Sequence, residues 1–380
     1  MSTLPRTEAA APAASRTGFT GGDLRLITGC AVVTAAAGGA RLVSLPSLVP
    51  FLIAAVALAL LASLVGRAVD ALGDRLGAGA TGVVQSALGN LPELFVCIFA
   101  LRDGLYDVVR AALVGSVLAN VLLVLGLAFV AGGLRHGTQR FGTARARTLS
   151  LLMFLSVGAW LIPSLTAALH TPASGHEQGL SVITAVLLLV LFALSIPASL
   201  AREGSSAQEG AGREGTQGEG AEGHGGGGRW PLAVTLIVLA VAGVAAAFVS
   251  DWFVASLTPA MEAAHISQAF AGLVVVAIAG NAVENVVGIQ LAARNQTDYA
   301  LSVILQSPLQ IALVLAPVLV LIAPLVGATF TLVLSPLLVA ALFIAVIATV
   351  LVVNDGESTW LEGATLVVLY ALVASAFWWG

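Results

Sequence analysis

Two acidic residues, Glu93 and Glu284, lie deep inside long apolar stretches of this 380-residue chain. Nearly all of its other acidic residues, out of 20, fall in tails, loops or the predicted ends of helices. A carboxylate at the depth of a lipid bilayer is costly, so such a residue usually faces a cavity and carries a function. The chemistry open to a buried pair of carboxylates is the binding of a cation, of protons, or of each in turn.

The two acids share a sequence context. The stretch "GNLPE" runs from Gly89 to Glu93 and "GNAVE" from Gly280 to Glu284, so the acids stand 191 residues apart. Chance rarely places the few polar residues of two apolar segments in one register, so the pattern predicts an internal repeat. The same offset, without a gap, also pairs Asn90 with Asn281, Asp107 with Asp298, Ser116 with Ser307, Leu118 with Leu309 and Leu122 with Leu313.

The polar residues around the two acids are typical ligands of a hard cation. Asn and Glu three positions apart share one face of a helix, and Gly89 and Pro92 weaken the helix around Asn90, which frees nearby carbonyls. Carboxylate, amide, hydroxyl and carbonyl oxygens are what Ca²⁺ takes in sets of about 6–8. We therefore predict a cation site made of Glu93, Glu284, Asn90, Asn281, Ser116, Ser307 and the carbonyls of Ala87 and Leu88. For Asn120 and Gln310 the sequence favours neither of two roles, further cation ligand or interhelical hydrogen-bonding residue.

Charge balance indicates how such a site would work. Two facing carboxylates without a buried arginine cannot both stay ionised in an empty site, because burial and mutual repulsion favour the neutral forms. They are stable when they hold either one divalent cation or protons, and this mutually exclusive occupancy is what an antiporter needs. None of the five histidines lies in a motif helix, so proton binding would rest on the carboxylates.

The composition restricts the class of protein. The chain is 58% hydrophobic and 9% charged, against about 25% charged residues in soluble domains, which indicates an integral membrane protein. A net charge of −4 without a basic stripe argues against a nucleic-acid partner. Two cysteines cannot build a disulfide framework. The absence of an HExxH, P-loop or nucleophile motif argues against an enzyme or an ATP-driven pump and predicts no cofactor.

The hydrophobic pattern predicts an all-α integral membrane protein with about eleven transmembrane helices, since a span needs about 20 apolar residues. The first is short and stands outside two repeats of five helices each. Asp107 and Asp298 are expected to be helix N-caps. The predicted segments lie near 25–40, 48–66, 80–101, 107–131, 146–169, 178–200, 231–251, 269–292, 299–325, 329–352 and 361–379.

Two low-hydrophobicity stretches divide the chain. The first 24 residues lack an apolar core after their charges and are expected to be a disordered cytoplasmic tail rather than a signal peptide. The glycine-rich acidic stretch 201–230 cannot bury a core and predicts a flexible linker. The predicted divisions are therefore a tail (1–24), an extra N-terminal helix (25–45), the first transmembrane repeat (46–200), the linker (201–230) and the second repeat (231–380).

The distribution of arginines predicts the orientation. Thirteen arginines fall on the side of the N-terminal tail and three on the other, which places the N-terminus and the linker in the cytoplasm and the C-terminus outside. The two motifs lie on the third and eighth segments, and an odd separation means that the repeats cross the membrane in opposite directions. Inverted repeats with polar, Gly- or Pro-interrupted helices are typical of secondary transporters that alternate access.

Three stretches carry a family resemblance: "QSALGNLPELFVCIFALRDGLYDVVRAALVGSVLANVLLVLG", "AGNAVENVVGIQLAARNQTDYALSVILQSPLQIALVLAP" and "NDGESTWLEGATLVVLYALVASAF". With them, nearly all of the chain beyond about residue 45 resembles the calcium/cation antiporter superfamily, in its calcium/proton antiporter branch. The resemblance implies a sodium/calcium exchanger-like fold and export of Ca²⁺ from the cytoplasm across the cell membrane in exchange for protons. It implies that Glu93 and Glu284 bind Ca²⁺ or protons in turn, in a site lined by Asn90, Asn281, Ser116, Ser307 and Gln310.

Some positions depart from the family pattern. Asn285 stands where the proton-coupled branch commonly has histidine, and Gln306 replaces a glycine before Ser307. Val117 and Pro308 stand where sodium/calcium exchangers usually have asparagine, which argues against sodium coupling. The alternatives are a related cation antiporter exchanging Na⁺ for Ca²⁺ or Na⁺ or K⁺ for H⁺, and a passive cation channel or a non-transporting membrane scaffold.

Overall fold

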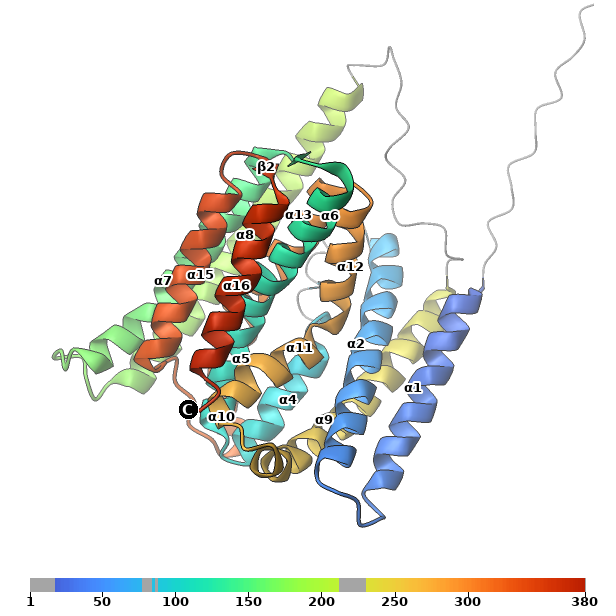
Figure 1. Ribbon diagram of the computed structural model, residues 1–380, viewed down its shortest axis with the longest axis vertical. Helices are drawn as coiled ribbons and strands as arrows, with labels where there is room; N and C mark the ends of the chain where they lie inside the picture. Colours follow the sequence, from blue (N-terminus) through green and yellow to red (C-terminus); the bar gives the residue numbers. More distant parts are fainter. Residues whose placement is uncertain (1–17, 77–83, 86–87, 212–229, 380) are drawn as a thin grey trace, which may run out of the picture.

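The structure is a computed structural model that describes residues 18–76, 84–85, 88–211 and 230–379. Most of the described chain is helical (Figure 1). A helix satisfies its main-chain N–H and C=O groups within one segment, which a bilayer interior without water requires of a spanning segment. The prediction of an all-α fold is confirmed.

Helices lie in each of the first six predicted segments, although residues 80–83 and 86–87 of the third segment are outside the described part of the chain. The helices are α1 (Gly21–Ala40), α2 (Leu48–Leu76), α4 (Leu91–Arg102), α5 (Tyr106–Leu118), the π-helical turn η1 (Ala119–Val124), α6 (Leu125–His136), α7 (Thr143–Ala168) and α8 (Glu177–Ala211), with the short strand β1 (Gln139–Arg140) between α6 and α7.

The helices after residue 230 cover the other five predicted segments. They are α9 (Leu232–Ala264), α10 (Gln268–Phe270), the π-helical turn η2 (Ala271–Val276), α11 (Ala277–Gly280), α12 (Ala282–Ala293), α13 (Thr297–Gln310), the π-helical turn η3 (Ile311–Leu315), α14 (Ala316–Ile322), the 3₁₀ turn η4 (Ala323–Val326), α15 (Pro336–Val352) and α16 (Trp360–Ala376), with strand β2 (Glu357–Ser358) before α16.

Long apolar helices dominate the described residues. Six of them are long and apolar enough to cross a membrane, or seven if the bent pair Gln268–Gly280 and Asn285–Ala293 forms one span, while α15 and α16 are apolar but shorter. In Figure 1, α1 runs downward on the right-hand side of the bundle, and α16 also runs downward, from β2 to the point marked C. Each predicted segment contains helix, but length and composition do not establish eleven crossings, so that number stays a prediction.

Two predicted boundaries are wrong. The tail does not extend to residue 24, because Thr20 caps α1 in a capping box with Asp23, and Asp23 pairs with Arg67 of α2 at 2.5 Å. The linker does not begin at residue 201, because α8 continues to Ala211. At its other end, Trp230 is buried and its indole donates to Asp23 Oδ2 at 3.2 Å. The rest of the predicted tail and linker, 1–17 and 212–229, lies outside the described residues.

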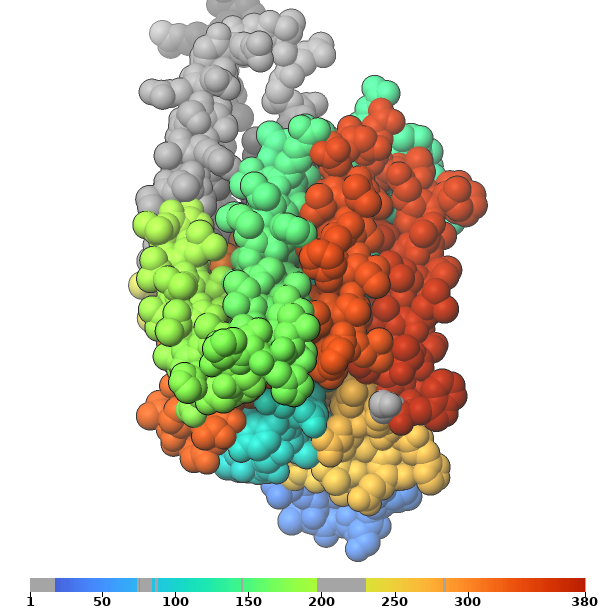
Figure 2. All heavy atoms as spheres, turned by 90° about the vertical axis from the view of Figure 1, so that its left-hand side faces the viewer, coloured from blue at the N-terminus to red at the C-terminus, as the bar shows by residue number. Residues whose placement is uncertain are grey.

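One face of the bundle is covered by exposed apolar side chains. Figure 2 shows this face, formed by α7, α8, α15 and α16. Contiguous apolar surface of this kind is unfavourable in water and suits the hydrocarbon of a bilayer. By contrast, the continuous helix Tyr106–His136 is largely buried. The exposed apolar side chains of these four helices include Leu155, Ile162, Ile183, Leu187, Ile344 and Leu372.

Two glycines allow the central helix α5 to cross the π-turn η2 at close range. A Cβ on Gly115 would collide with the main chain of Leu273, and a Cβ on Gly272 would collide with the carbonyl of Val108. Only a residue without a side chain fits at both positions. Ser116 follows Gly115 directly, so this crossing fixes where the α5 hydroxyl lies relative to the second half of the chain.

Candidate cation-binding site

The two motif helices break at equivalent asparagines. Asn90 and Asn281 precede α4 and α12 as N-cap residues with nearly the same backbone, φ −95°, ψ 20° and φ −109°, ψ 20°. Neither side chain caps its own helix, so both amides are free for tertiary contacts. The helices α4 and α12 begin and end at the same 191-residue offset that separates Glu93 from Glu284.

Glu93 lies in the first turn of α4 and is only 1% exposed. Its Oε1 atom accepts a hydrogen bond from the Ser116 hydroxyl of α5. Its side chain also faces the second half of the chain, since a Cβ built on Gly280 would lie 3.5 Å from Glu93 Cβ and 3.7 Å from its carboxyl carbon. The carboxyl of the first motif therefore packs against the glycine of the second motif.

Five side chains from both halves form a chain of hydrogen bonds that ends on Glu93. The Asn120 amide donates to Ser307 Oγ at 3.4 Å, Ser307 donates to Asn281 Oδ1 at 3.2 Å, and Asn281 donates to Ser116 Oγ at 3.0 Å. Ser116 then donates to the Glu93 carboxyl. Each group in this chain donates toward Glu93, so the last acceptor is a carboxyl oxygen, which suits an ionised carboxylate.

The orientation of the two amides follows from main-chain contacts. Asn281 Nδ2 donates to Ala277 O at 3.0 Å and Asn120 Nδ2 donates to Ser116 O at 2.9 Å. A carbonyl can only accept, so the nitrogen of each amide must point at it. The Oδ1 atom of Asn120 is buried with no hydrogen-bond partner among the described residues. A buried acceptor of this kind is costly unless something binds it, and a cation would.

A second contact joins the two halves beside this chain. Asn90 donates to Gln310 Oε1 at 3.4 Å, and both side chains are nearly buried. Gln310 lies one turn after Ser307 on α13, at the start of the π-turn η3. The structure thus brings together seven of the predicted site residues: Asn90, Glu93, Ser116, Asn120, Asn281, Ser307 and Gln310.

The remaining predicted ligands are less fully described. Leu88 is helical and partly buried just before the break at Gly89. Ala87 lies outside the described residues. The backbone of Glu284 belongs to α12, but its side chain is outside the described part. The neighbouring Asn285 has a buried Oδ1 atom without a hydrogen-bond partner among the described residues.

The chemistry of the assembled donors is that of a hard-cation site. Carboxylate, amide and hydroxyl oxygens from α4, α5, η1 and α13 meet at the buried break of α12, and Ca²⁺ prefers such oxygen ligands. Among the described residues, no group of three His, Cys, Asp or Glu side chains could hold a metal ion. A site built on these described residues therefore depends on neutral oxygens around Glu93.

Sequence reasoning missed Ser250 of α9. This fully buried hydroxyl donates to the carbonyl of Pro92 at 3.4 Å, next to Glu93. The signal available was weak, a single serine in the apolar run "AAAFVSDWFV".

The structure also corrects the role of the two paired aspartates. Leu105 and Gln296, not Asp107 and Asp298, are the N-cap residues of α5 and α13. Asp107 pairs instead with Arg110 at 3.0 Å, and Asp298 accepts a hydrogen bond from the Gly142 N–H at 2.6 Å. Each aspartate lies two residues after the N-cap, which removes the capping geometry, because the N-cap side chain is the one that reaches the free N–H groups of the first turn.

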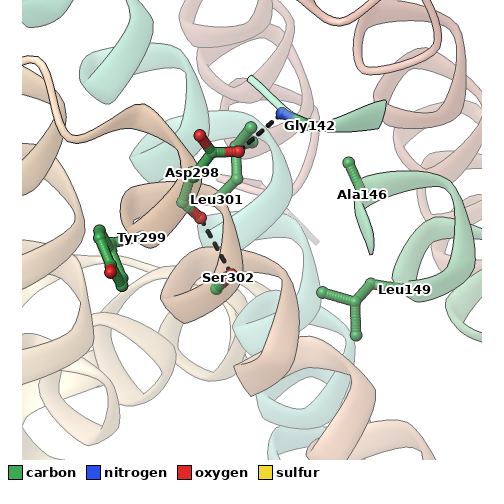
Figure 3. A pocket seen from close by; sticks show the side chains of 7 residues that line it. All are labelled: Gly142, Ala146, Leu149, Asp298, Tyr299, Leu301 and Ser302. Carbon is green, nitrogen blue, oxygen red and sulfur yellow. Dashed lines mark hydrogen bonds between the residues drawn. The ribbon is translucent and has the colours of Figure 1, made fainter. Parts of the chain in front are cut away.

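A pocket of about 280 Å³ lies beside Asp298, between the start of α7 and α13. Figure 3 shows Asp298 and Ser302 on α13 facing Gly142, Ala146 and Leu149. None of the buried residues around Glu93 lines this pocket. We therefore assign it to the end of the bundle and not to the candidate cation site.

Comparisons with known proteins agree with this geometry. The model of the family described as "Sodium/calcium exchanger protein" matches residues 46–200 and 234–379. The chain is 34% identical to the Ca²⁺/H⁺ antiporter of Synechocystis sp. over 339 residues, which are 86% of this chain and 90% of that protein. It is also 34% identical to the Ca²⁺/H⁺ antiporter ChaA of Bacillus subtilis over 333 residues, covering 87% of this chain and 92% of that protein.

Solved structures agree at the level of the fold. The structure of native YfkE matches with a TM-score of 0.77 and 30% sequence identity, covering 93% of this chain and 99% of that chain. The relatives are named as ion transporters and not as enzymes. This chain therefore belongs to the sodium/calcium exchanger protein family, and within it to the calcium/proton antiporter branch.

Proposed function

We propose that this protein is a secondary antiporter of the cell membrane that exports Ca²⁺ from the cytoplasm in exchange for protons. The similar proteins of Synechocystis sp. and Bacillus subtilis carry the name Ca²⁺/H⁺ antiporter. The observation that carries the proposal is the buried chain of hydrogen bonds that links both halves of the molecule and ends on the Glu93 carboxyl. It supplies hard oxygen ligands around a carboxylate, which both Ca²⁺ and a proton can neutralise.

In this proposal Glu93 and Glu284 hold Ca²⁺ or protons in turn. The amide and hydroxyl oxygens of Asn90, Asn281, Ser116 and other network members would complete the ligand set, and the free Oδ1 atom of Asn120 supports this. A second carboxyl at Glu284 would give the site the charge needed for a divalent cation. Ca²⁺ and H⁺ are then substrates of the transporter, and no resident cofactor is needed.

The proposed architecture consists of an extra N-terminal helix and two inverted repeats of five helices, one from α2 through α8 and one from α9 through α16, joined by the acidic glycine-rich stretch between α8 and α9. Supporting observations are the equal bounds of α4 and α12 at the 191-residue offset, the corresponding π-turns η1 and η3, and the two separate stretches matched by the family model. The arginine distribution supports a cytoplasmic N-terminus and linker, with the C-terminus outside.

Alternating access would operate at the two helix breaks. The pair Gln268–Gly280 and Asn285–Ala293 bends by 64° at the second motif. Gly280 also packs against the Glu93 side chain, so the breaks of both repeats lie at one buried point. Movement there would expose the carboxylates to one side of the membrane at a time.

The test is ⁴⁵Ca²⁺ uptake into proteoliposomes with an acidic interior, with and without a protonophore or an internal Na⁺ load. We expect uptake that requires the proton gradient and does not respond to Na⁺. Glu93→Gln should abolish it, since the amide cannot exchange a proton for a cation, while Glu262→Gln, the same change at an exposed position, should leave it intact. Uptake driven only by Na⁺, or full activity of Glu93→Gln, would contradict the proposal.

A further inference from the structure

The two π-turns next to the candidate site each leave one carbonyl outside the main-chain hydrogen-bond ladder. In η1 the Leu125 N–H bonds Asn120 O, five residues back, before α-helical bonding resumes in α6. In an α-helix each N–H bonds the carbonyl four residues back, so the return to this pattern skips the carbonyl of Val121. At the end of η3 the Ala316 N–H bonds Ile311 O and the next residue, Pro317, has no N–H, so the carbonyl of Ala312 is likewise left without a main-chain donor.

Each skipped carbonyl is bonded by a side chain from a neighbouring helix. Thr349 of α15 places its hydroxyl 3.4 Å from Val121 O, and Trp160 of α7 places its indole N–H 3.2 Å from Ala312 O. Both donors are fully buried, at 0% exposure. The Thr349 hydroxyl also lies 2.8 Å from Ala345 O in its own helix, so its single proton serves two acceptors.

The two contacts are equivalent in the two halves of the chain. Val121 and Ala312 stand at the same 191-residue offset as Glu93 and Glu284. The donors differ in chemical type, a hydroxyl in one half and an indole in the other. In both halves, a buried side-chain donor bonds the carbonyl that the π-turn leaves without a main-chain donor.

The π-turns determine where the site residues point. Asn120 lies inside η1, and Gln310 directly precedes η3. A π-turn holds one residue more than an α-turn, and each residue rotates a helix by about 100°. Relaxation of η1 to α-helical geometry would therefore rotate Ser116 and Asn120 relative to the apolar part of the same helix, away from Asn281 and Ser307.

We propose that Thr349 and Trp160 are positioning residues of the cation site, which hold η1 and η3 in π geometry by donating to Val121 O and Ala312 O. This inference rests on the proposed function of the same site. An unpaired buried carbonyl is costly, so removal of either donor favours conformations in which the turn is relaxed. The apparent affinity for the cation then falls in proportion to the fraction of protein that keeps the turn.

The experiment measures the Ca²⁺ dependence of proton-driven uptake for Thr349→Val, Thr349→Ser and Trp160→Phe. Thr349→Val keeps the shape of the side chain and removes the donor. We expect its apparent KM for Ca²⁺ to rise about three- to tenfold with a smaller change in kcat, and Thr349→Ser to restore the wild-type KM. Trp160→Phe should raise KM in the same way.

Thr235→Val is the matched control. Thr235 is as buried as Thr349, but its hydroxyl donates only to Pro231 O at the start of its own helix. We expect its KM to equal that of the wild type. A Thr349→Val variant with wild-type KM, or an equal rise of KM in Thr235→Val, would overturn the inference.

A second measurement covers variants that express poorly. Ca²⁺ raises the thermal unfolding midpoint of a protein that binds it in the folded state. We expect Thr349→Val and Trp160→Phe to need about three- to tenfold more Ca²⁺ for the same rise; an unchanged Ca²⁺ requirement would overturn the inference. Failure of the wild type itself to transport Ca²⁺ would instead contradict the proposed function, which keeps the two failures distinct.

Discussion

At the scale of single residues, the Glu93 carboxyl depends on groups from both halves of the chain. It accepts a hydrogen bond from Ser116, which is itself bonded by Asn281, and its carbon atoms lie against Gly280. A buried carboxylate is stable only with donors or a cation nearby. Binding at Glu93 is therefore sensitive to the position of the second motif, which a transporter with two coupled halves requires.

Ser116→Ala tests this dependence. The substitution removes the donor to Glu93, and we expect Ca²⁺ uptake to fall about tenfold or more, because a hydrogen bond to a charged group contributes about 1.5–3 kcal/mol. Uptake into proteoliposomes, normalised to reconstituted protein, measures the effect. Ser156→Ala is the control, since that buried hydroxyl donates only to Leu152 O in its own helix. An equal loss in the two variants would argue against a specific role of Ser116.

That the polar residues lie close together could be predicted, but the side chains that donate to the carbonyls of the neighbouring π-turns could not. In a gapless repeat, equivalent polar residues occupy equivalent positions in the two halves. The sequence therefore predicted that Asn90, Ser116 and their counterparts Asn281 and Ser307 line one site. Trp160 and Thr349 could not be predicted from spacing, because Thr349 is a lone polar residue in the apolar helix α15 and a tryptophan such as Trp160 looks like an ordinary packing residue. The need for them arises only from the π-turns, which have no clear signature in the sequence.

At the scale of elements, the crossing of α5 and η2 sets the distance between the halves. Gly115 and Gly272 allow main chain to approach main chain there. The sequence predicted the helical segments because their apolar runs are long. It did not predict the N-cap positions or the extension of α8 to Ala211, since a boundary depends on one or two local hydrogen bonds rather than on a long pattern.

Gly115→Ala should disrupt this crossing. The added methyl group would meet the backbone of Leu273, which cannot move aside as a flexible side chain can, and overpacking costs about 1–3 kcal/mol. We expect a lower thermal unfolding midpoint in detergent and reduced transport. Gly158→Ala, in a helix where no atom lies within 4 Å of the added group, should leave both unchanged. A Gly115→Ala variant as stable and active as the wild type would mean that neither stability nor transport depends on the close approach of α5 to η2.

At the scale of the whole molecule, α7, α8, α15 and α16 form one face of the bundle (Figure 2) and carry exposed apolar side chains. The N-terminal end is also tied to the residues just before α9, since the Trp230 indole donates to Asp23, which pairs with Arg67 of α2 as well. Composition predicted the membrane class, because few charged residues can be accommodated in lipid. Contacts such as that of Trp230 need the folded chain and could not be read from its glycine-rich surroundings.

The orientation predicts which loops impermeant reagents can reach. Thr138→Cys places a thiol at the exposed turn after α6, and His176→Cys places one at the exposed turn before α8. We expect an impermeant maleimide to label only His176→Cys on intact cells, and both variants after permeabilisation. The native Cys30 and Cys97 are buried and should remain unlabelled. Labelling of Thr138→Cys on intact cells would reverse the orientation.

The central claim is that Ca²⁺ and protons compete for the same buried carboxylates. Calorimetric titration of the purified protein with Ca²⁺, in buffers of different ionisation enthalpy, counts the protons released on binding. We predict net proton release for the wild type, with an apparent affinity that falls as the pH falls, and less release for Glu93→Gln. Tight Ca²⁺ binding without proton release, and with the same affinity at each pH, would contradict the account.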